Sequence, residues 1–318
     1  MLSDPQSLMT ANLVSQGGVS WADLSHKALV SLSGREGLDF IQRLSTNDVS
    51  KLEVGAAMET LLTNEKGRVV DLVFVIRITG DTLLLVGETV GQHTLTEWLN
   101  RFIIMEDLQL VNANDDYRRI AIWPSSKNDV VSNKHIEYIE LAASEYQTVS
   151  YVLKSFLNYS FTELLVQRDQ FAAGKLSSTV SASSELSSDD FDSFRIATGA
   201  PGAPGEICGR YNPFELRLDR LVSFTKGCFI GQEVIARLDT YKKPQRRLTL
   251  IEFATEKELP REATILTVTG SSAGMLTSVT RRNSTVRSLA MISAEFAEDL
   301  DFFIEPTTGQ RINGKRVT

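Results

Sequence analysis

Cysteine, histidine and long apolar runs are scarce in this sequence of 318 residues, and each scarcity excludes a class of protein. The two cysteines, Cys208 and Cys228, are too few for a secreted disulfide framework or a self-contained zinc or iron–sulfur site. The three histidines are scattered along polar stretches, which disfavours a histidine-based metal site. The apolar runs fall far short of the roughly 20 residues that span a bilayer. We therefore expect no intrinsic metal and no membrane span.

A signal peptide and an excess of basic residues are also missing. The first residues show no basic stretch followed by an apolar one, so we expect a cytoplasmic protein. Asp and Glu number 40 against 33 Lys and Arg, which gives a formal net charge of −7. An acidic chain disfavours sequence-independent binding of nucleic acid, because such binding needs a dominant basic surface.

The standard catalytic signatures are absent as well. The sequence has no Walker A motif, no G-x-G-x-x-G after a strand, no H-E-x-x-H and no G-x-S-x-G. What remains is an ordinary globular composition, with 42% hydrophobic and 23% charged residues. The length favours two domains or three small ones.

The apolar spacing in the first part of the chain alternates between helix and strand periods. Spacing of three and four residues predicts helices over 36–46 and 92–104, whereas alternation predicts strands over 58–63, 70–78 and 83–86. The turn at 80–81 is typical of a hairpin. This order of helix, three-stranded meander and helix favours an α+β fold with antiparallel sheet over a doubly wound parallel one.

Turn residues divide the rest of the chain into two further regions. In the first we expect strands over 118–123, 135–141 and 148–153, a helix over 162–171, an exposed Ser-rich loop over 177–190 and a helix that begins near 189 and stops at 199–205. After Pro244, strand-like segments at 247–253, 263–269, 275–280 and 287–293 predict a small C-terminal β-barrel or sandwich.

The segment with the most chemical content is 212–238. We expect a helix over 212–222, a tight loop over 226–231 and a second helix that starts at Gln232. The N-terminus of that helix and nearby Lys226 would stabilise a thiolate at Cys228. The alternative is that Cys228 is a small buried residue beside two structural glycines. Gly227 and Gly231 are expected to be backbone requirements, because a loop that enters a helix commonly needs φ > 0 or close chain approach.

The octapeptide KGCFIGQE at 226–233 resembles the K-G-C-[YF]-x-G-Q-E signature of the YgfZ family, whose members are folate-binding relatives of the glycine-cleavage T-protein, an aminomethyltransferase. Further stretches follow the order of that family: GREGLDFIQRLSTNDVSKLEVG at 34–55, LLTNEKGRVVDLVFV at 61–75, and FRIATGAP leading into NPFELRLD. The resemblance extends from about residue 21 to residue 250. After residue 250, the chain resembles the family only in being rich in residues that favour β-strands.

The resemblance implies a three-part ring, in which two antiparallel α+β lobes and a small C-terminal β-barrel surround a channel that holds tetrahydrofolate. On this basis we expect a folate-binding α+β region at 1–115 and 190–240, a second α+β lobe with the Ser-rich loop at 116–189, and the barrel at 241–318. The implied cofactor is tetrahydrofolate or a one-carbon derivative.

The resemblance also implies site residues. Cys228 is the candidate reactive thiol, and Asp71 is a second catalytic candidate. Lys242 and Lys243 belong to a basic run at 241–247 that could receive the polyglutamate tail of cellular folates. A solvated linker is the simpler interpretation of such a run. The remaining folate-binding candidates are Asn47, Asp48, Lys226, Gly227, Gly231, Gln232 and Glu233.

Two departures from the relatives concern carboxylates. The T-protein carries an acidic pair where this chain has only Asp71. The spacing from Gly67 to Asp71 is also one residue shorter than the corresponding spacing in the T-protein. Many relatives read R-I-E-A-G where this chain has Ala197 in the sequence RIATG, so a carboxylate partner for the pterin ring is absent at that position.

Three functional hypotheses follow. The first is a tetrahydrofolate-binding accessory protein in the assembly or repair of iron–sulfur enzymes, acting with client enzymes or assembly factors and indirectly affecting tRNA modification. The second is a true aminomethyltransferase that transfers a one-carbon unit to tetrahydrofolate. The third is a structural or RNA-binding module that uses Arg118, Arg119, Arg281, Arg282 and Arg287, which the acidic net charge disfavours.

Overall fold

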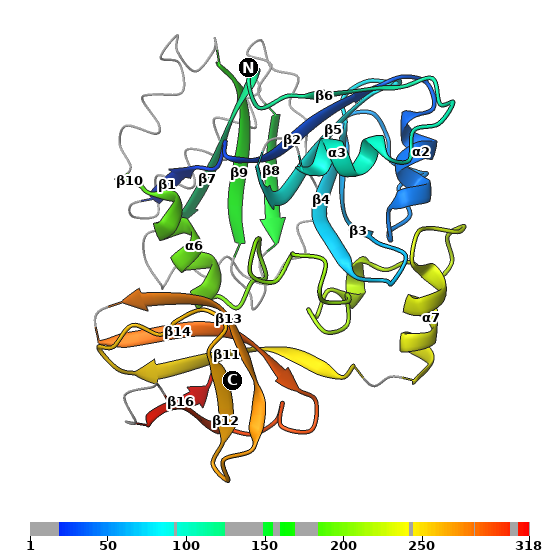
Figure 1. The fold of residues 1–318 in the computed structure, drawn as a ribbon. Helices are drawn as coiled ribbons and strands as arrows, with labels where there is room; N and C mark the ends of the chain where they lie inside the picture. Colours follow the sequence, from blue (N-terminus) through cyan, green and yellow to red (C-terminus); the bar gives the residue numbers. More distant parts are fainter. Residues whose placement is uncertain are drawn as a thin grey trace, which may run out of the picture. The chain divides into compact units, whose positions relative to one another are not determined.

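The computed structural model describes residues 19–91, 94–124, 149–154, 160–168, 184–241, 244–282, 284–305 and 311–317 (Figure 1). The chain divides into two compact units. Unit 1 consists of Met1–Gln42, Val49–Glu59 and Val73–Phe191, and unit 2 consists of Arg43–Asp48, Thr60–Leu72 and Asp192–Thr318. Each unit is therefore assembled from separate stretches of the sequence.

The described part of the chain before residue 190 forms two five-stranded sheets. The first sheet has the order β10-β1-β7-β9-β8, with bounds Ser184–Leu186, Val19–Asp23, Tyr117–Pro124, Ser160–Gln167 and Val149–Lys154. The second has the order β3-β4-β5-β2-β6, with bounds Ala57–Thr63, Val69–Arg77, Thr82–Val90, Lys27–Ser33 and Gln109–Asn112. β1 pairs with β10 in parallel, so the first sheet is mixed where an antiparallel sheet was expected.

The core of unit 1 joins residues from both sheets. Apolar side chains of β2, β4, β5 and β9 pack in one buried cluster that includes Leu29, Phe74, Ile76, Leu84, Val86 and Leu165. A buried ion pair joins neighbouring strands of the first sheet, because Arg119 on β7 donates from its Nε to the carboxylate of Glu163 on β9. Arg119 is 1% exposed, so it is not available to RNA as the third hypothesis required.

The helices of the described residues are short. They are α2 (Gly37–Leu44), α3 (Thr94–Asn100), α6 (Ser188–Ala197), the 3₁₀ helix η2 (Asp219–Leu221) and α7 (Gln232–Tyr241). Helical spacing correctly predicts α2 and α3, and α3 buries its Leu95, Trp98 and Leu99 side chains as that spacing requires. α6 ends just before Gly199, which adopts φ +79°, as the expected stop at 199–205 indicates.

Two predicted helices are wrong. The segment 162–171 was expected to be helical, but Ser160–Gln167 forms β9, because both of its edges pair with strands β7 and β8. The segment 212–222 forms turns and η2 instead of one helix. Arg217 adopts φ +58°, a left-handed conformation that cannot continue an α-helix.

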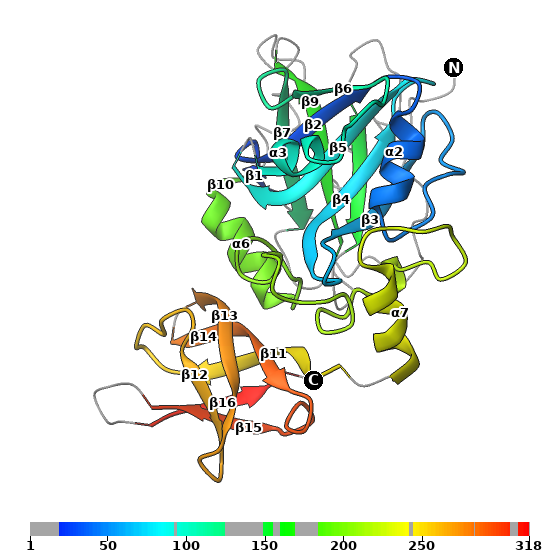
Figure 2. The ribbon, with the colours of Figure 1, turned by 45° about the vertical axis from the view of Figure 1, so that its right-hand side comes forward.

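The C-terminal segment closes into a barrel with the order β11-β14-β13-β12-β15-β16 (Figure 2). The strands are Arg246–Ala254 (β11), Thr264–Thr267 (β12), Ser272–Arg282 (β13), Thr285–Ser293 (β14), Asp301–Ile304 (β15) and Ile312–Arg316 (β16). Inward-facing residues such as Ile251, Phe253, Leu276 and Ile292 form its core. The predicted barrel and the α+β fold class are both confirmed.

Several expectations fall partly or wholly outside the described residues. The strand expected at 135–141 lies outside them, as do residues 177–183 of the expected Ser-rich loop. The described part of that loop is wrong, because residues 184–186 form β10 and residues 188–190 begin α6. The strands expected at 118–123 and 148–153 are confirmed as β7 and β8. Within the described residues, no helix combines the length and apolar character needed to cross a membrane.

Candidate functional site

Lys226 ties the octapeptide loop to a distant turn of unit 2. Its Nζ donates to the carbonyl oxygens of Ser45 at 2.6 Å and Asn47 at 2.8 Å. The Asn47 amide group accepts from the N–H of Asp48, and the Asn47 N–H donates to the Thr60 hydroxyl at 2.9 Å. The structure thus brings together three predicted site residues, Asn47, Asp48 and Lys226.

The surroundings of Lys226 lower the pKa of its ammonium group. The residue is 8% exposed, and burial lowers the pKa of Lys226 to about 8, against the attraction of Asp48, which raises it. Its ammonium also lies 5.4 Å from the centroid of the Phe229 ring, within the range of a cation–π contact. Its ammonium thus donates to oxygens of Ser45 and Asn47 in the turn at 45–47.

The end of the loop is held by a second set of contacts. The Thr63 hydroxyl donates to the carbonyl oxygen of Ile230 at 2.6 Å. Gly231 adopts φ +82°, and a Cβ there would lie 2.4 Å from the carbonyl oxygen of Asn64. The predicted backbone requirement is therefore confirmed at Gly231. It is wrong at Gly227, where φ lies outside the left-handed region and a Cβ would meet no atom within 4 Å.

Cys228 lies on the exposed part of this loop. Its side chain is exposed, so the alternative of a buried structural cysteine is wrong. Phe229, Ile230 and Gly231 separate it from the first helical residue, Gln232. Gln232 and Glu233 form the first turn of α7, and Glu233 is exposed. The arrangement presents a thiol to solvent from a loop that is anchored at both ends.

Asp71 lies near the start of β4 and is fully buried. Its Oδ1 accepts from the N–H of Leu72 at 2.8 Å. Two backbone hydrogen bonds hold the strand next to it, because the Val69 N–H donates to the Tyr211 carbonyl and the Gly209 N–H donates to the Val69 carbonyl. This carboxylate is an interior group of unit 2 and not a solvated one.

Sequence reasoning missed a buried ion pair beside the departure at Ala197. The Arg195 guanidinium donates to the Glu206 carboxylate at 3.1 Å and to the Ala200 carbonyl at 2.6 Å. Glu206 is fully buried and also accepts from the N–H of Gly202 and from the Thr277 hydroxyl on β13. The signal was a lone arginine in RIATG followed by a glutamate in a Gly/Pro loop, a pattern that many solvated pairs share.

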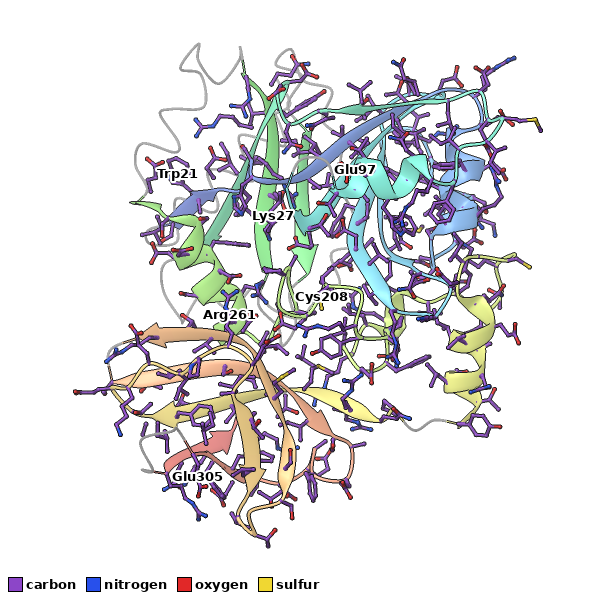
Figure 3. All side chains as sticks on the ribbon, in the orientation of Figure 1. Trp21, Lys27, Glu97, Cys208, Arg261 and Glu305 are labelled. Atoms are coloured by element: carbon purple, nitrogen blue, oxygen red, sulfur yellow. The ribbon has the colours of Figure 1, made fainter. Side chains whose placement is uncertain are left out.

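The second cysteine has a different environment from Cys228. Cys208 lies on the loop after α6 (Figure 3), and the Nε of Arg210 donates to its Sγ at 3.4 Å. This hydrogen bond raises the pKa of the Arg210 guanidinium. The Sγ of Cys208 donates in turn to the Gly205 carbonyl at 3.5 Å. Cys208 is therefore engaged by its own loop.

The basic run at 241–247 is described only in part. Lys242 and Lys243 lie outside the described residues. Arg246 pairs with the buried Glu215 at 3.1 Å, and Arg247 pairs with the exposed Glu298 at 3.4 Å. Within the described residues, no group of three His, Cys, Asp or Glu side chains is placed to hold a metal ion.

Comparisons with known proteins give one family. Residues 12–226 match the GCVT N-terminal domain family. The chain is 25% identical over 273 residues to a chloroplastic protein of Arabidopsis thaliana assigned to the transferases, which covers 83% of this chain and 62% of the relative. It is 26% identical over 316 residues to an aminomethyltransferase of Exiguobacterium sibiricum, which covers 94% of this chain and 85% of the relative.

The fold has a solved counterpart. The crystal structure of glycine cleavage system aminomethyltransferase T from Bartonella henselae superimposes with a TM-score of 0.75 at 16% identity. The similarity covers 100% of this chain and 90% of that chain. The structural similarity therefore includes the barrel, for which the sequence showed only strand-rich composition.

Proposed function

The chain belongs to the GCVT N-terminal domain family. From this membership and from the octapeptide KGCFIGQE at 226–233, we propose that it is a tetrahydrofolate-binding accessory protein of the YgfZ type. Its proposed role is in the assembly or repair of iron–sulfur enzymes, together with client enzymes or assembly factors. An effect on tRNA modification would be indirect, through iron–sulfur enzymes that modify tRNA. The proposed location is cytoplasmic.

The observation that carries this proposal is the exposed thiol of Cys228. Lys226 holds one end of its loop to the turn at 45–47, and the Thr63 hydroxyl holds the other end through the Ile230 carbonyl. A thiol held in this way can approach a partner protein without the loop being ordered first, which lowers the entropic cost of association.

The carboxylates of unit 2 fit a folate ligand in part. The amino and ring N–H groups of a pterin need carboxylate or carbonyl acceptors. Asp48 is half-buried beside Lys226, and it is the residue that we propose for this role together with Asn47. Ala197 supplies no carboxylate, and Glu206 already accepts from Arg195, Gly202 and Thr277.

The extent of the folate-binding region is part of the proposal. We assign it to 1–115 and 190–240, with 116–189 as the second lobe and 241–318 as the barrel domain. The candidate residues Asn47, Asp48, Asp71, Lys226 and Cys228 all belong to unit 2. That unit combines the octapeptide with two short segments from the N-terminal part of the chain.

Aminomethyl transfer is the second candidate function, because bacterial relatives carry the name aminomethyltransferase. Asp71 would then be the group that acts on the folate amine. Its carboxylate is buried and the acidic pair of the T-protein is reduced to this one residue, so we rank the activity second. Formation of methylene-tetrahydrofolate from an aminomethylated lipoyl carrier protein would reverse the order.

Calorimetric titration with tetrahydrofolate and with folinic acid tests the folate part of the proposal. We expect saturable binding of one or both ligands. The thiol is tested separately by complementation of a strain that lacks the protein, with the activity of an iron–sulfur tRNA-modifying enzyme as the readout. Cys228→Ser should keep the melting temperature and lose complementation, whereas Cys208→Ser should keep both. Full complementation by Cys228→Ser would contradict a role for the thiol.

A further inference from the structure

Unit 2 contains a second cleft, formed by residues other than the site candidates above. It has a volume of about 490 Å³, within the range of small-molecule sites, and lies between the loop at 214–224, α7 and the start of β11. Its apolar wall consists of Phe214, Phe224, Leu238 and Pro244. Phe214 packs on the buried cluster of Val222, Phe229 and Ile235, so this wall is backed by the core.

Two arginines line the cleft, and the first of them has no ion pair among the described residues. Arg217 lines it with its backbone at φ +58°, a strained conformation that commonly persists at functional sites. No ion pair of Arg217 occurs among the residues that the structure describes. Arg247 lines the same cleft, and its partner Glu298 also binds Arg316 at 2.8 Å. Arg247 and Arg316 therefore share one carboxylate.

The pKa of Arg217 reflects its charged neighbours. Burial and the neighbouring charges of Arg247 and Arg316 lower the pKa of its guanidinium, and Glu298 opposes them. An anion between Arg217 and Arg247 would relieve this repulsion and accept charge-assisted hydrogen bonds. Two further lining residues, Asp219 and Asp239, carry negative charge and accept hydrogen bonds. They would suit a ligand that has an N–H group as well as an anionic one.

We propose that this cleft binds a small aromatic carboxylate that carries an N–H group. The ring packs between the Phe214 and Phe224 side chains, the carboxylate receives hydrogen bonds from Arg217 and Arg247, and the N–H donates to Asp219 or Asp239. Phe224 is 46% exposed, so covering its ring with a ligand removes apolar surface from water. The proposal does not depend on the proposed function.

The ligand could come from two sources with this chemistry. One is a free aryl amide acid, and the other is the p-aminobenzoylglutamate half of a bound folate. Phe224 stands close in sequence to the octapeptide, and Leu238 and Asp239 lie on α7, which follows it directly. The same segment of chain therefore carries the proposed folate residues and one wall of the cleft.

Hippurate (N-benzoylglycine) and p-aminobenzoylglutamate are the probes, titrated calorimetrically into the full-length protein at up to millimolar concentration. We expect saturable binding that weakens about tenfold in Arg217→Gln and in Arg247→Gln, because each loses hydrogen bonds between charged groups. Phe224→Ala should weaken binding as well. Arg237→Gln on exposed α7 surface is the matched control and should bind as the unchanged protein does. Melting temperatures of the variants show that they remain folded.

Competition with tetrahydrofolate identifies the source. If tetrahydrofolate displaces hippurate, the cleft takes the tail of folate. If hippurate binds equally with and without tetrahydrofolate, the ligand is an independent aryl acid. Either outcome supports the cleft as a site. The first also requires that the protein binds tetrahydrofolate, whereas the second holds even if the folate proposal fails. Absence of saturable binding by both probes, or equal binding by the unchanged protein and both folded arginine variants, would overturn the proposal.

Discussion

Replacing Gly231 with alanine tests the loop geometry on which the candidate site depends. A Cβ at this position would lie 2.4 Å from the Asn64 carbonyl oxygen and 2.9 Å from the Gly67 Cα. Both are backbone atoms, so neither can rotate away. The left-handed conformation at φ +82° adds roughly 1–2 kcal/mol for a residue with a Cβ. Overpacking typically adds about 1–3 kcal/mol. We therefore expect Gly231→Ala to lower the free energy of unfolding by about 2–5 kcal/mol.

Urea titration and thermal unfolding measure this loss. Since 1 kcal/mol corresponds to about 2–4 °C in a domain of this size, the melting temperature should fall by at least about 4 °C. Gly227→Ala is a matched control within the same octapeptide, because its Cβ would meet no atom and its backbone is ordinary. It should stay within about 1 kcal/mol of the unchanged protein. Equal losses in the two variants would refute the proposed geometry.

Three further perturbations concern charges of the chain. Since burial lowers the pKa of Lys226 from 10.5 to about 8, the unfolded chain holds a proton that the native protein releases between these values. Urea titrations should find the free energy of unfolding rising over that pH window, and a Lys226→Met variant that keeps the whole rise would contradict this. Glu206→Gln removes the buried carboxylate partner of Arg195 and leaves it the Asp192 carboxylate at 2.7 Å. The loss should cost about 1.5–3 kcal/mol in the same titrations, and a cost below about 0.5 kcal/mol would argue against the Arg195–Glu206 pair. Lys242→Ala combined with Lys243→Ala should weaken the binding of pentaglutamyl folate about tenfold in calorimetry and leave the binding of the monoglutamate unchanged. Equal effects on both ligands would indicate that the basic run at 241–247 is a solvated linker.

The spacing of apolar residues correctly predicts the helices and strands whose apolar side chains are buried at that same spacing. β4 alternates between buried and half-buried residues at its start, and α3 buries its apolar stripe. The barrel strands β11, β12, β13 and β14 were also predicted, because turn residues bound each of them. β15 and β16 were not predicted.

The wrong helices have causes that the local sequence does not contain. β9 has helix-forming residues, but Glu163 within it is buried against Arg119, which comes from a strand far earlier in the chain. In the segment 212–222, the amide oxygen of Asn212 accepts from the N–H groups of Phe214 and Glu215, as expected at a helix start. Arg217 then leaves the helical region. Tertiary context overrides propensity in both cases.

In the candidate site, too, the local sequence predicts some features, whereas others depend on residues far away in the chain. The octapeptide correctly predicts that Gly231 is a backbone requirement, because a loop that enters a helix constrains φ locally. The partners of Lys226 lie 181 and 179 residues away, and the local sequence contains no trace of them. An interpretation confined to the motif therefore assigns the Lys226 charge to the neighbouring Cys228. In the structure the Lys226 ammonium donates to two carbonyl oxygens of that distant turn, so Lys226 positions the loop that presents the exposed thiol.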